Sequence, residues 1–567
     1  MKYLLLPVLP IFALIGGCVD SNRPQPSPFA DFVFLNAAVY TADETRSWAQ
    51  AVAITEGEIV FVGSSEEAQQ WIGPNTRQEN LEGKMLMPSF HDAHAHIRYG
   101  GTSSLGCDLE SSPTIVEIQN ILRSCIESGR YGPDDWVMGN GWPPAAFKDA
   151  NPHKSILDEA LNGRPAFFSD DFGHNAWVSS KALEFAGITA ATEDPDKGVI
   201  VRDSTTGEPS GTLRETAMAL VEGVMPQLTD EQRYTGLQHG LSAANAFGIS
   251  AFVEPGVSES NLSLYKLADE RGELTARVLA SLSPIDELPD SVGPELFDLL
   301  AKRDKYRGQY LAVDSVKIYI DGVIETRTSY MLEPYLDGEN FPPFYAQEEL
   351  NTLYTKLDGM GIQIHTHAIG DAAIRNALNA YEHMLNENGP NDNRHQMVHL
   401  QLVDKQDIPR FGELNVAANF QCMWCYPDVY IDLARDIVGS ARVDRFYPVA
   451  SIHRTDGLLV GGSDWNVSSL NPLDAIETAV SRKNPLSNEG PALGTGEEVD
   501  LATALDMYTR NAAYVMRLDD RTGSIEVGKR ADLIVLDRNL FEIPVSEINE
   551  AKVLRTLLDG QPVYSVN

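Results

Sequence analysis

The sequence predicts an α/β protein with a parallel sheet or barrel at its centre and a small β-sandwich built from both chain ends. In the middle of the chain, short apolar runs typical of strands alternate with helical stretches. Several of these runs end in a charged or imidazole residue followed by a loop, as at the reactive mouth of a parallel barrel. Both chain ends carry strand-like runs, and 567 residues suffice for a large barrel plus a smaller domain.

The first residues predict a processing segment that is not part of the fold. Lys2 precedes an apolar run too short to span a bilayer comfortably, so residues 1–17 are predicted to be a signal peptide. The small residues before Cys18 resemble a bacterial lipobox, which implies export, cleavage before Cys18 and a lipid anchor on its thiol. An ordinary secretory signal with a chance cysteine is the alternative. Val19 is similar to the usual signal for the outer membrane, facing the periplasm. Residues 18–28, with three prolines, predict a flexible tether.

The remaining chain is predicted to divide into a sandwich and a barrel. Residues 29–87 and 520–567 are expected to form the β-sandwich, because chain termini often meet at the surface. Residues 88–519 are expected to form the barrel. The span after His96 is too long for one β/α unit, so we expect an inserted lobe at about 100–240 that covers the mouth. The expected barrel strands after the lobe are 248–254, 278–282, 315–320, 362–367, 396–399 and 458–464.

The formal net charge of -37 argues against nucleic acid as a partner, because a phosphate backbone would be repelled. The acidic residues are spread along the chain, which favours a solvated acidic surface over a functional acidic patch for cationic substrates.

The cysteines after the tether form two pairs. In an exported protein, Cys107 and Cys125 are candidates for a disulfide. Cys422 and Cys425 have redox spacing, but no thioredoxin-like context surrounds them, so we assign them no redox role.

The segment around which the chain is organised is 88–96, which follows the apolar run 85–87 and carries His94 and His96. We interpret it as the end of a buried strand that opens into a loop. Side chains alternate along a strand, so both imidazoles are expected on the same side, where they can bind one divalent ion. Two histidines hydrogen-bonded in a loop are the alternative.

Further blocks follow in order along the chain, at 316–322, 367–371, Arg394 with His399, 462–464 and 528–533. Together with 88–96 they resemble the amidohydrolase superfamily and, within it, amidohydrolase family 3, the group of N-substituted formamide deformylase-like metal-dependent hydrolases. The likeness covers nearly everything after the tether, and the ordered blocks are far more specific than any one of them. Ser89 departs from the glycine usual in the family, which changes a turn and should leave the ligands undisturbed.

The resemblance implies a (β/α)8 TIM-type barrel with one or two divalent metal ions, zinc being the expected metal. It implies that His94 and His96 bind the more buried ion with Asp464 as an oxygen ligand, and that His367 and His399 bind a second ion. Mixed imidazole and carboxylate ligands suit a hydrolytic zinc site. Taken singly, His367 and His399 are also explained as hydrogen-bonded histidines, and Asp464 as a helix cap.

Lys317 ends a buried apolar run, where an ammonium is costly unless it is paired or neutralised. The resemblance implies a carboxylated Lys317 whose carbamate bridges both ions. A salt bridge to Glu254 or Asp321, with a single metal ion, is the alternative.

The implied activity is hydrolysis of a carbon–nitrogen bond other than a peptide bond, in an amide, N-acyl or N-formyl small-molecule substrate. A metal-activated hydroxide attacks the carbonyl, and Asp464 takes the water proton and passes it to the leaving amine. Ester or carbamate hydrolysis is the alternative within enzymes, and a catalytically inactive surface-binding lipoprotein is the alternative outside them.

Three further residues are candidates for supporting roles. His174 resembles part of the family's inserted-lobe motif and is expected to contact substrate, and Trp142 is expected to wall the pocket. Either could equally pack in a core. His365 shares a strand face with His367 and is a candidate for orienting a ligand. The sequence leaves the oligomeric state open, with a homodimer as one alternative.

Overall fold

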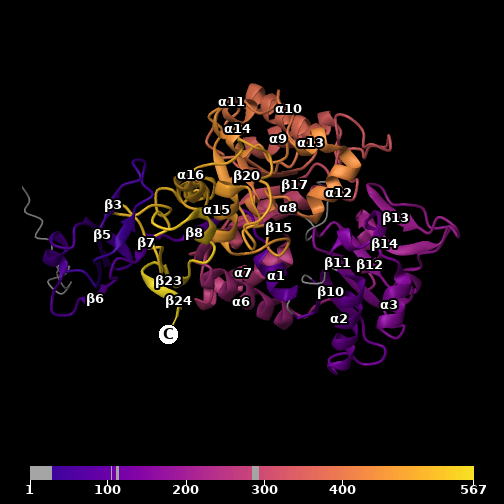
Figure 1. The fold of residues 1–567 in the computed structure, drawn as a ribbon, viewed down its shortest axis with the longest axis horizontal. Coiled ribbons are helices and arrows are strands. Elements are labelled where there is room, and N and C mark those ends of the chain that lie inside the picture. The colour runs from indigo at the N-terminus through magenta and orange to yellow at the C-terminus, as the bar shows by residue number, and fades with distance from the viewer. Residues whose placement is uncertain (1–28, 104, 110–113, 284–292, 567) are drawn as a thin grey trace, which may run out of the picture.

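The computed structural model describes residues 29–103, 105–109, 114–283 and 293–566, and Figure 1 shows their arrangement. The predicted signal peptide, the predicted lipidation site Cys18 and the predicted tether lie outside the described residues. Within the described ranges, no helix is both long and apolar enough to cross a membrane.

Eight parallel strands form the central sheet, in the order β21-β20-β19-β18-β17-β16-β15-β8. Its two edges meet, because the backbone N–H of Ala93, just after β8, donates to the carbonyl oxygen of Gly461 in β21 at 3.0 Å. The predicted α/β class and parallel barrel are therefore confirmed. The barrel strands are β8 (Phe90–Asp92), β15 (Ile249–Val257), β16 (Arg277–Leu282), β17 (Leu311–Tyr319), β18 (Gln363–Ala368), β19 (Gln396–His399), β20 (Ala417–Phe420) and β21 (Leu459–Gly461).

Helices alternate with these strands along the chain and pack on the sheet in one large apolar core, which includes Phe252, Leu262 and Tyr381. Local signals set their ends. For example, Thr229 and Gln232 form a reciprocal capping box at the start of α6, and Gly272 ends α7 in the left-handed conformation. The helices outside the lobe are α1 (Ile97–Ser103), α6 (Asp230–Ala246), α7 (Glu259–Arg271), α8 (Pro294–Lys302), α9 (Gln347–Gly359), α10 (Asp371–Asn388), α11 (Arg410–Glu413), α12 (Val429–Val438), α13 (Ser440–Val443), α14 (Val449–His453), α15 (Pro472–Ser481), α16 (Leu501–Met507) and α17 (Arg510–Val515).

The helix α1 begins directly after His96 and packs closely on α6. A Cβ atom added at Gly101 would lie 2.0 Å from the carbonyl oxygen of Gly236, and one added at Gly240 would lie 2.1 Å from that of Ile97. Only glycine allows the two backbones to approach this closely. The contact fixes the chain immediately after the histidine pair.

The β-sandwich is built from both chain ends, as predicted. In Figure 1 the indigo start and the yellow end of the chain lie together on the left. One sheet has the order β24-β23-β22-β7-β2-β3 and the other β5-β4-β1-β6, and an apolar cluster that includes Phe34, Leu86 and Val535 contains residues of both. The strands are β1 (Phe32–Leu35), β2 (Ala38–Tyr40), β3 (Trp48–Ala49), β4 (Ala51–Thr55), β5 (Glu58–Gly63), β6 (Arg77–Asn80), β7 (Met85–Pro88), β22 (Leu533–Leu536), β23 (Val553–Leu558) and β24 (Gln561–Ser565).

A further six-stranded sheet, in the order β13-β14-β12-β11-β10-β9, forms the inserted lobe at the right of Figure 1. A disulfide joins Cys107 in β9 to Cys125 in α2, whereas Cys422 and Cys425 are buried free thiols. The lobe elements are β9 (Cys107–Asp108), α2 (Ile115–Glu127), β10 (Val137–Trp142), α3 (Lys154–Ala160), β11 (Ala166–Asp170), β12 (Asn175–Val178), α4 (Ser180–Ala186), β13 (Gly198–Arg202), β14 (Pro209–Glu215) and α5 (Ala219–Glu222).

Candidate metal centre

The histidine pair lies beyond the end of its strand. The interpretation that the run 85–87 is the strand leading to it is wrong: that run is β7 of the sandwich, and Ser89 separates it from the barrel strand β8, which ends at Asp92. Alternation along a strand therefore does not align the two imidazoles. The loop does so instead, because the Nε2 atoms of His94 and His96 lie 3.2 and 3.1 Å from the same oxygen of Asp464.

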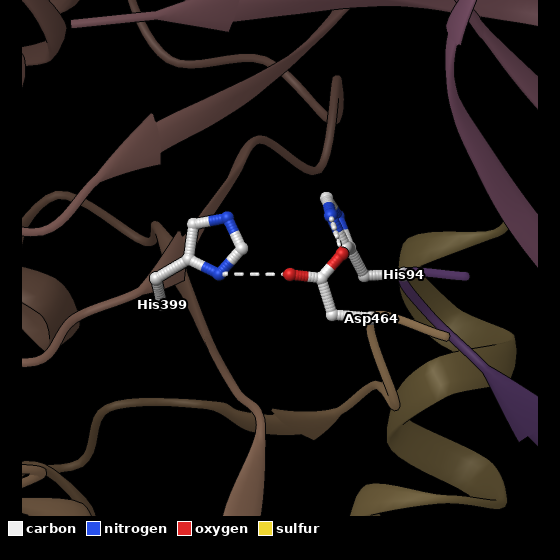
Figure 2. A group of neighbouring side chains, drawn as sticks. All are labelled: His94, His399 and Asp464. Carbon is white, nitrogen blue, oxygen red and sulfur yellow. Dashed lines mark ion pairs between the residues drawn. The ribbon is translucent and has the colours of Figure 1, made fainter. Parts of the chain in front are cut away.

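Asp464 follows β21 and lies between imidazoles from different parts of the barrel. Figure 2 shows its carboxylate between the rings of His94 and His399, with the His399 Nδ1 atom 3.7 Å from its second oxygen. Burial alone would raise the pKa of Asp464, but the hydrogen bond from His96 and the nearby amine of Lys317 hold this pKa well below its usual range. The carboxylate is therefore ionised at neutral pH.

Buried partners orient the ligand histidines. The Nδ1 atom of His94 lies 2.7 Å from Nε2 of His365, and the Nδ1 atom of His399 lies 2.9 Å from the side-chain oxygen of Gln421. In each ring this contact leaves Nε2 available. Burial lowers the pKa of both His94 and His399 well below the usual value, so the rings are neutral, the form that binds metal ions.

The predicted second pair of ligands, His367 and His399, also meets. Their ring centroids lie 4.5 Å apart, and the ring centroid of His174 from the inserted lobe lies 5.1 Å from that of His367. His174 pairs with Glu215 at 2.9 Å. Although burial opposes it, this carboxylate raises the pKa of His174, which favours the protonated ring.

Lys317 lies in β17 with its Nζ atom 3.5 Å from Nε2 of His94. The two carboxylates considered as salt-bridge partners accept backbone hydrogen bonds instead, Glu254 from the N–H groups of Ile97 and Arg98, and Asp321 from those of three loop residues. Burial lowers the pKa of Lys317 to about 7 against the opposing effect of Asp464, so a large share of the amine is neutral at physiological pH.

The side chains that meet here line two connected chambers at the carboxyl ends of the barrel strands. The inner chamber has a volume of about 60 Å³ and is lined by His94, His96, Lys317 and Asp464, among others. The outer chamber has a volume of about 230 Å³. Residues of both linings, including His174, His367, His399 and Asp464, connect the two.

Trp142 does not contribute to these chambers. Its indole is completely buried in the lobe's own core, packs against Phe147 and Trp177, and donates a hydrogen bond to the carbonyl oxygen of Phe168 at 2.9 Å. The expectation that Trp142 walls the pocket is corrected to a packing role. Its place at the end of β10, inside the lobe sheet, is the physical reason.

Two supporting residues were not predicted from the sequence. Gln421 follows β20, which the apolar pattern did not reveal, and no motif marks it. Glu215 ends the fully buried strand β14. The residues of β14 (Pro209–Glu215) are mostly polar in sequence, so no apolar run marked Glu215.

The donor set fits a divalent cation. His94, His399 and Asp464 each offer one ligand atom, and the three atoms lie within 4.8 Å of one another in a buried site. Two neutral imidazoles and an ionised carboxylate match the ligands of catalytic zinc and related metals. The backbone is left-handed at His399 (φ 80°) and Asp464 (φ 53°), a strained state that is common at functional sites.

Comparison with known proteins decides the family. The model described as "Amidohydrolase family" matches residues 78–564. The chain belongs to this family. Protein LONG AFTER FAR-RED 3 of Arabidopsis thaliana is 30% identical, with 97% of this chain and 94% of that protein covered. N-substituted formamide deformylase of Arthrobacter pascens is 27% identical, with 94% and 97% covered.

The fold of this amidohydrolase has a counterpart among solved structures. The crystal structure of a metal-dependent hydrolase from Pyrococcus horikoshii OT3 superimposes with a TM-score of 0.70 at 24% identity, over 91% of this chain and 99% of that one. Family and fold together support metal-dependent hydrolysis as the general activity.

Proposed function

We propose that this amidohydrolase cleaves a carbon–nitrogen bond in a non-peptide amide, N-acyl or N-formyl compound. The observation that carries the proposal is the ionised carboxylate of Asp464, which lies among the imidazoles of His94, His96 and His399 at the junction of the two chambers. The likeness to N-substituted formamide deformylase over 94% of the chain supports this bond type.

We propose one or two zinc ions at this centre, with His94, His96 and Asp464 around one position and His367 and His399 around the other. When bound, such an ion lowers the pKa of a coordinated water toward neutrality and polarises a carbonyl oxygen. Lys317 lies beside His94, and its neutral amine can add to CO2, forming a carbamate with loss of one proton. The carbamate would give both positions a shared oxygen ligand.

The side chains of this centre would supply the proton transfers and the positioning. Asp464, being ionised, can accept a proton from the attacking water and return it to the leaving nitrogen, which must be protonated to depart as an amine. His174, protonated by its pairing with Glu215, lies beside His367 and can donate a hydrogen bond to a substrate oxygen.

A substrate panel tests the proposed function. The zinc-loaded protein should hydrolyse N-formyl and N-acetyl derivatives of simple primary amines, with a kcat/KM at least about tenfold above that for matched dipeptides, a difference of about 1.4 kcal/mol. Matched esters and carbamates are the comparison. If the protein with its full metal content hydrolyses the esters or carbamates but none of the amides, the proposed amide hydrolysis is wrong and ester or carbamate hydrolysis takes its place. No turnover of any member would favour a binding protein.

We also propose that the protein is exported and anchored through a lipid on Cys18, on the outer membrane facing the periplasm. The proposal depends on the lipobox-like residues before Cys18. Labelled palmitate should be incorporated into the native protein and absent from a Cys18→Ala variant, which should also leave the membrane fraction. Equal distribution of both proteins between membrane and soluble fractions would contradict the anchor.

A further inference from the structure

The outer chamber has an aromatic lining. Five phenylalanine, tyrosine and tryptophan side chains line it, from the inserted lobe, the segment after β20, the helix α12 and the loop before α14. These side chains are Phe172, Trp424, Tyr426, Tyr430 and Tyr447. The Phe172 and Tyr430 rings pack edge to face with centroids 4.9 Å apart, which joins the lobe to the barrel side across the chamber. The face of an aromatic ring carries partial negative charge and attracts a cation that lies over it.

The same chamber carries three carboxylates besides Asp464. Glu325 is only 4% exposed, and one of its oxygens accepts a hydrogen bond from Gln401 at 2.7 Å. One oxygen of Asp428 accepts hydrogen bonds from the N–H groups of Tyr430 and Ile431 in the first turn of α12, at 3.0 and 2.9 Å. Asp171 accepts the Tyr430 hydroxyl, while its other oxygen is buried without a hydrogen bond.

The lysine and arginine side chains that the structure describes do not balance these carboxylates. Within the described ranges, none of the three forms an ion pair, and the residues that line the chamber include neither lysine nor arginine. The positive charge of His174, at the junction with the inner chamber, is already paired with Glu215. Burying unpaired carboxylates is costly, so this arrangement favours any positive charge that enters.

The raised pKa values of Glu325 and Asp428 also favour a bound cation in this chamber. Burial, with a contribution from the charge of Asp428, raises the pKa of Glu325 to about 7, and burial raises the pKa of Asp428 to about 6. A cation close to both carboxylates would stabilise their ionised forms and lower these pKa values. Aromatic faces add attraction for an organic cation, most of all where water is excluded.

We propose that the outer chamber binds an organic ammonium group between Glu325, Asp428 and the surrounding aromatic rings. Because the chambers are connected at His174 and Asp464, one molecule can place its ammonium in the outer chamber and its reacting bond in the inner one. This inference deepens the proposed function and rests on it for the reacting bond. The substrate class is then an N-acyl or N-formyl amide that carries a second, positively charged amine.

Binding of a matched pair of probes tests the chamber without requiring turnover. Choline and its uncharged carbon isostere dimethylbutanol have the same shape, and neither a quaternary nitrogen nor a tert-butyl group can ligate a metal ion. Calorimetric titration of the zinc-loaded full chain should give a Kd for choline at least about tenfold below that for dimethylbutanol. Equal affinities of the two probes would overturn the proposal.

Two charge-removing variants locate the effect. Glu325→Gln retains an oxygen for Gln401, and Asp428→Asn retains the cap of α12, so both should fold. Each variant should reduce the ratio of the Kd for dimethylbutanol to the Kd for choline to about threefold or less. The reason is that one remaining carboxylate attracts the ammonium less strongly than two do. Glu348→Gln, at an exposed position on α9, is the matched control and should leave the preference unchanged. A preference that survives in both chamber variants would contradict the assignment.

A kinetic arm separates this inference from the proposed function. Monoacetylated diaminobutane should be cleaved with a kcat/KM at least about tenfold above that for its uncharged isostere N-pentylacetamide, and the anionic acetamidopentanoate should be the poorest substrate. If choline binds through Glu325 but no amide is cleaved, the proposed function fails and the cation site stands. If amides are cleaved without preference for the ammonium, the proposed function stands and the cation site fails.

Discussion

The Asp464→Asn variant should lose amide hydrolysis by a factor of about a hundred to ten thousand in kcat, the usual range for a positioned general acid–base group. Asparagine retains the shape of the side chain and one oxygen toward His94 and His96, but it cannot accept and return a proton. The loss should fall mainly on kcat, because Glu325, Asp428 and the aromatic rings proposed to bind the substrate in the outer chamber are unchanged. Initial rates with the formamide and acetamide panel provide the measurement.

Comparing ester with amide hydrolysis by Asp464→Asn gives a second test of the same prediction. An alkoxide departs with less need of a proton than an amine does, so Asp464→Asn should impair any residual ester hydrolysis less than amide hydrolysis. Asp298→Asn, at an exposed position on α8, is the matched control and should keep full activity. Wild-type turnover by Asp464→Asn would show that this carboxylate is not the proton carrier.

Removing the His94 imidazole should abolish both metal binding and activity. His94 is nearly fully buried and contacts Asp464, His365 and Lys317, so its loss removes one of the three candidate ligands His94, His399 and Asp464. Metal analysis of His94→Ala after gel filtration should find the tightly bound metal lost, with kcat/KM reduced by more than the about 10–100-fold expected for a residue that only orients a ligand. A His365→Ala variant should show that smaller loss.

The exposed His453 on α14 provides the control for this series, since His453→Ala removes an imidazole far from the chambers. It should keep its metal and its activity. Equal metal content in His94→Ala and His453→Ala would contradict the assignment of His94 as a ligand.

The barrel could be predicted from the sequence because several of its strands are apolar runs that end in a charged or imidazole residue. Lys317, His367 and His399 all lie in such runs, and each is found at the mouth. The strand β20 was missed, since 417–420 contains two alanines and an asparagine and carries little of the β-branched signal. Its neighbours β19 and β21 hold it in the sheet.

The parts that the sequence could not provide depend on contacts between distant segments. Glu325 and Asp428 lie in loops with no shared motif, and only the closed barrel brings them to one chamber. The high overall acidity concealed them, because a charge of -37 makes any single carboxylate look like solvated surface. Trp142 was assigned to the pocket by its neighbours in the sequence, whereas the lobe sheet directs it into a core.

The most direct test of the central claim is a crystal structure of the zinc-loaded protein with anomalous data collected at the zinc absorption edge. An anomalous peak at about 2.0–2.2 Å from His94 Nε2 and from a carboxylate oxygen of Asp464 is the predicted result. Additional density on Lys317 Nζ should mark the carbamate, and a second peak beside His367 and His399 should mark a second ion. Active protein with no peak at these side chains, or with its only peak elsewhere, would contradict the account.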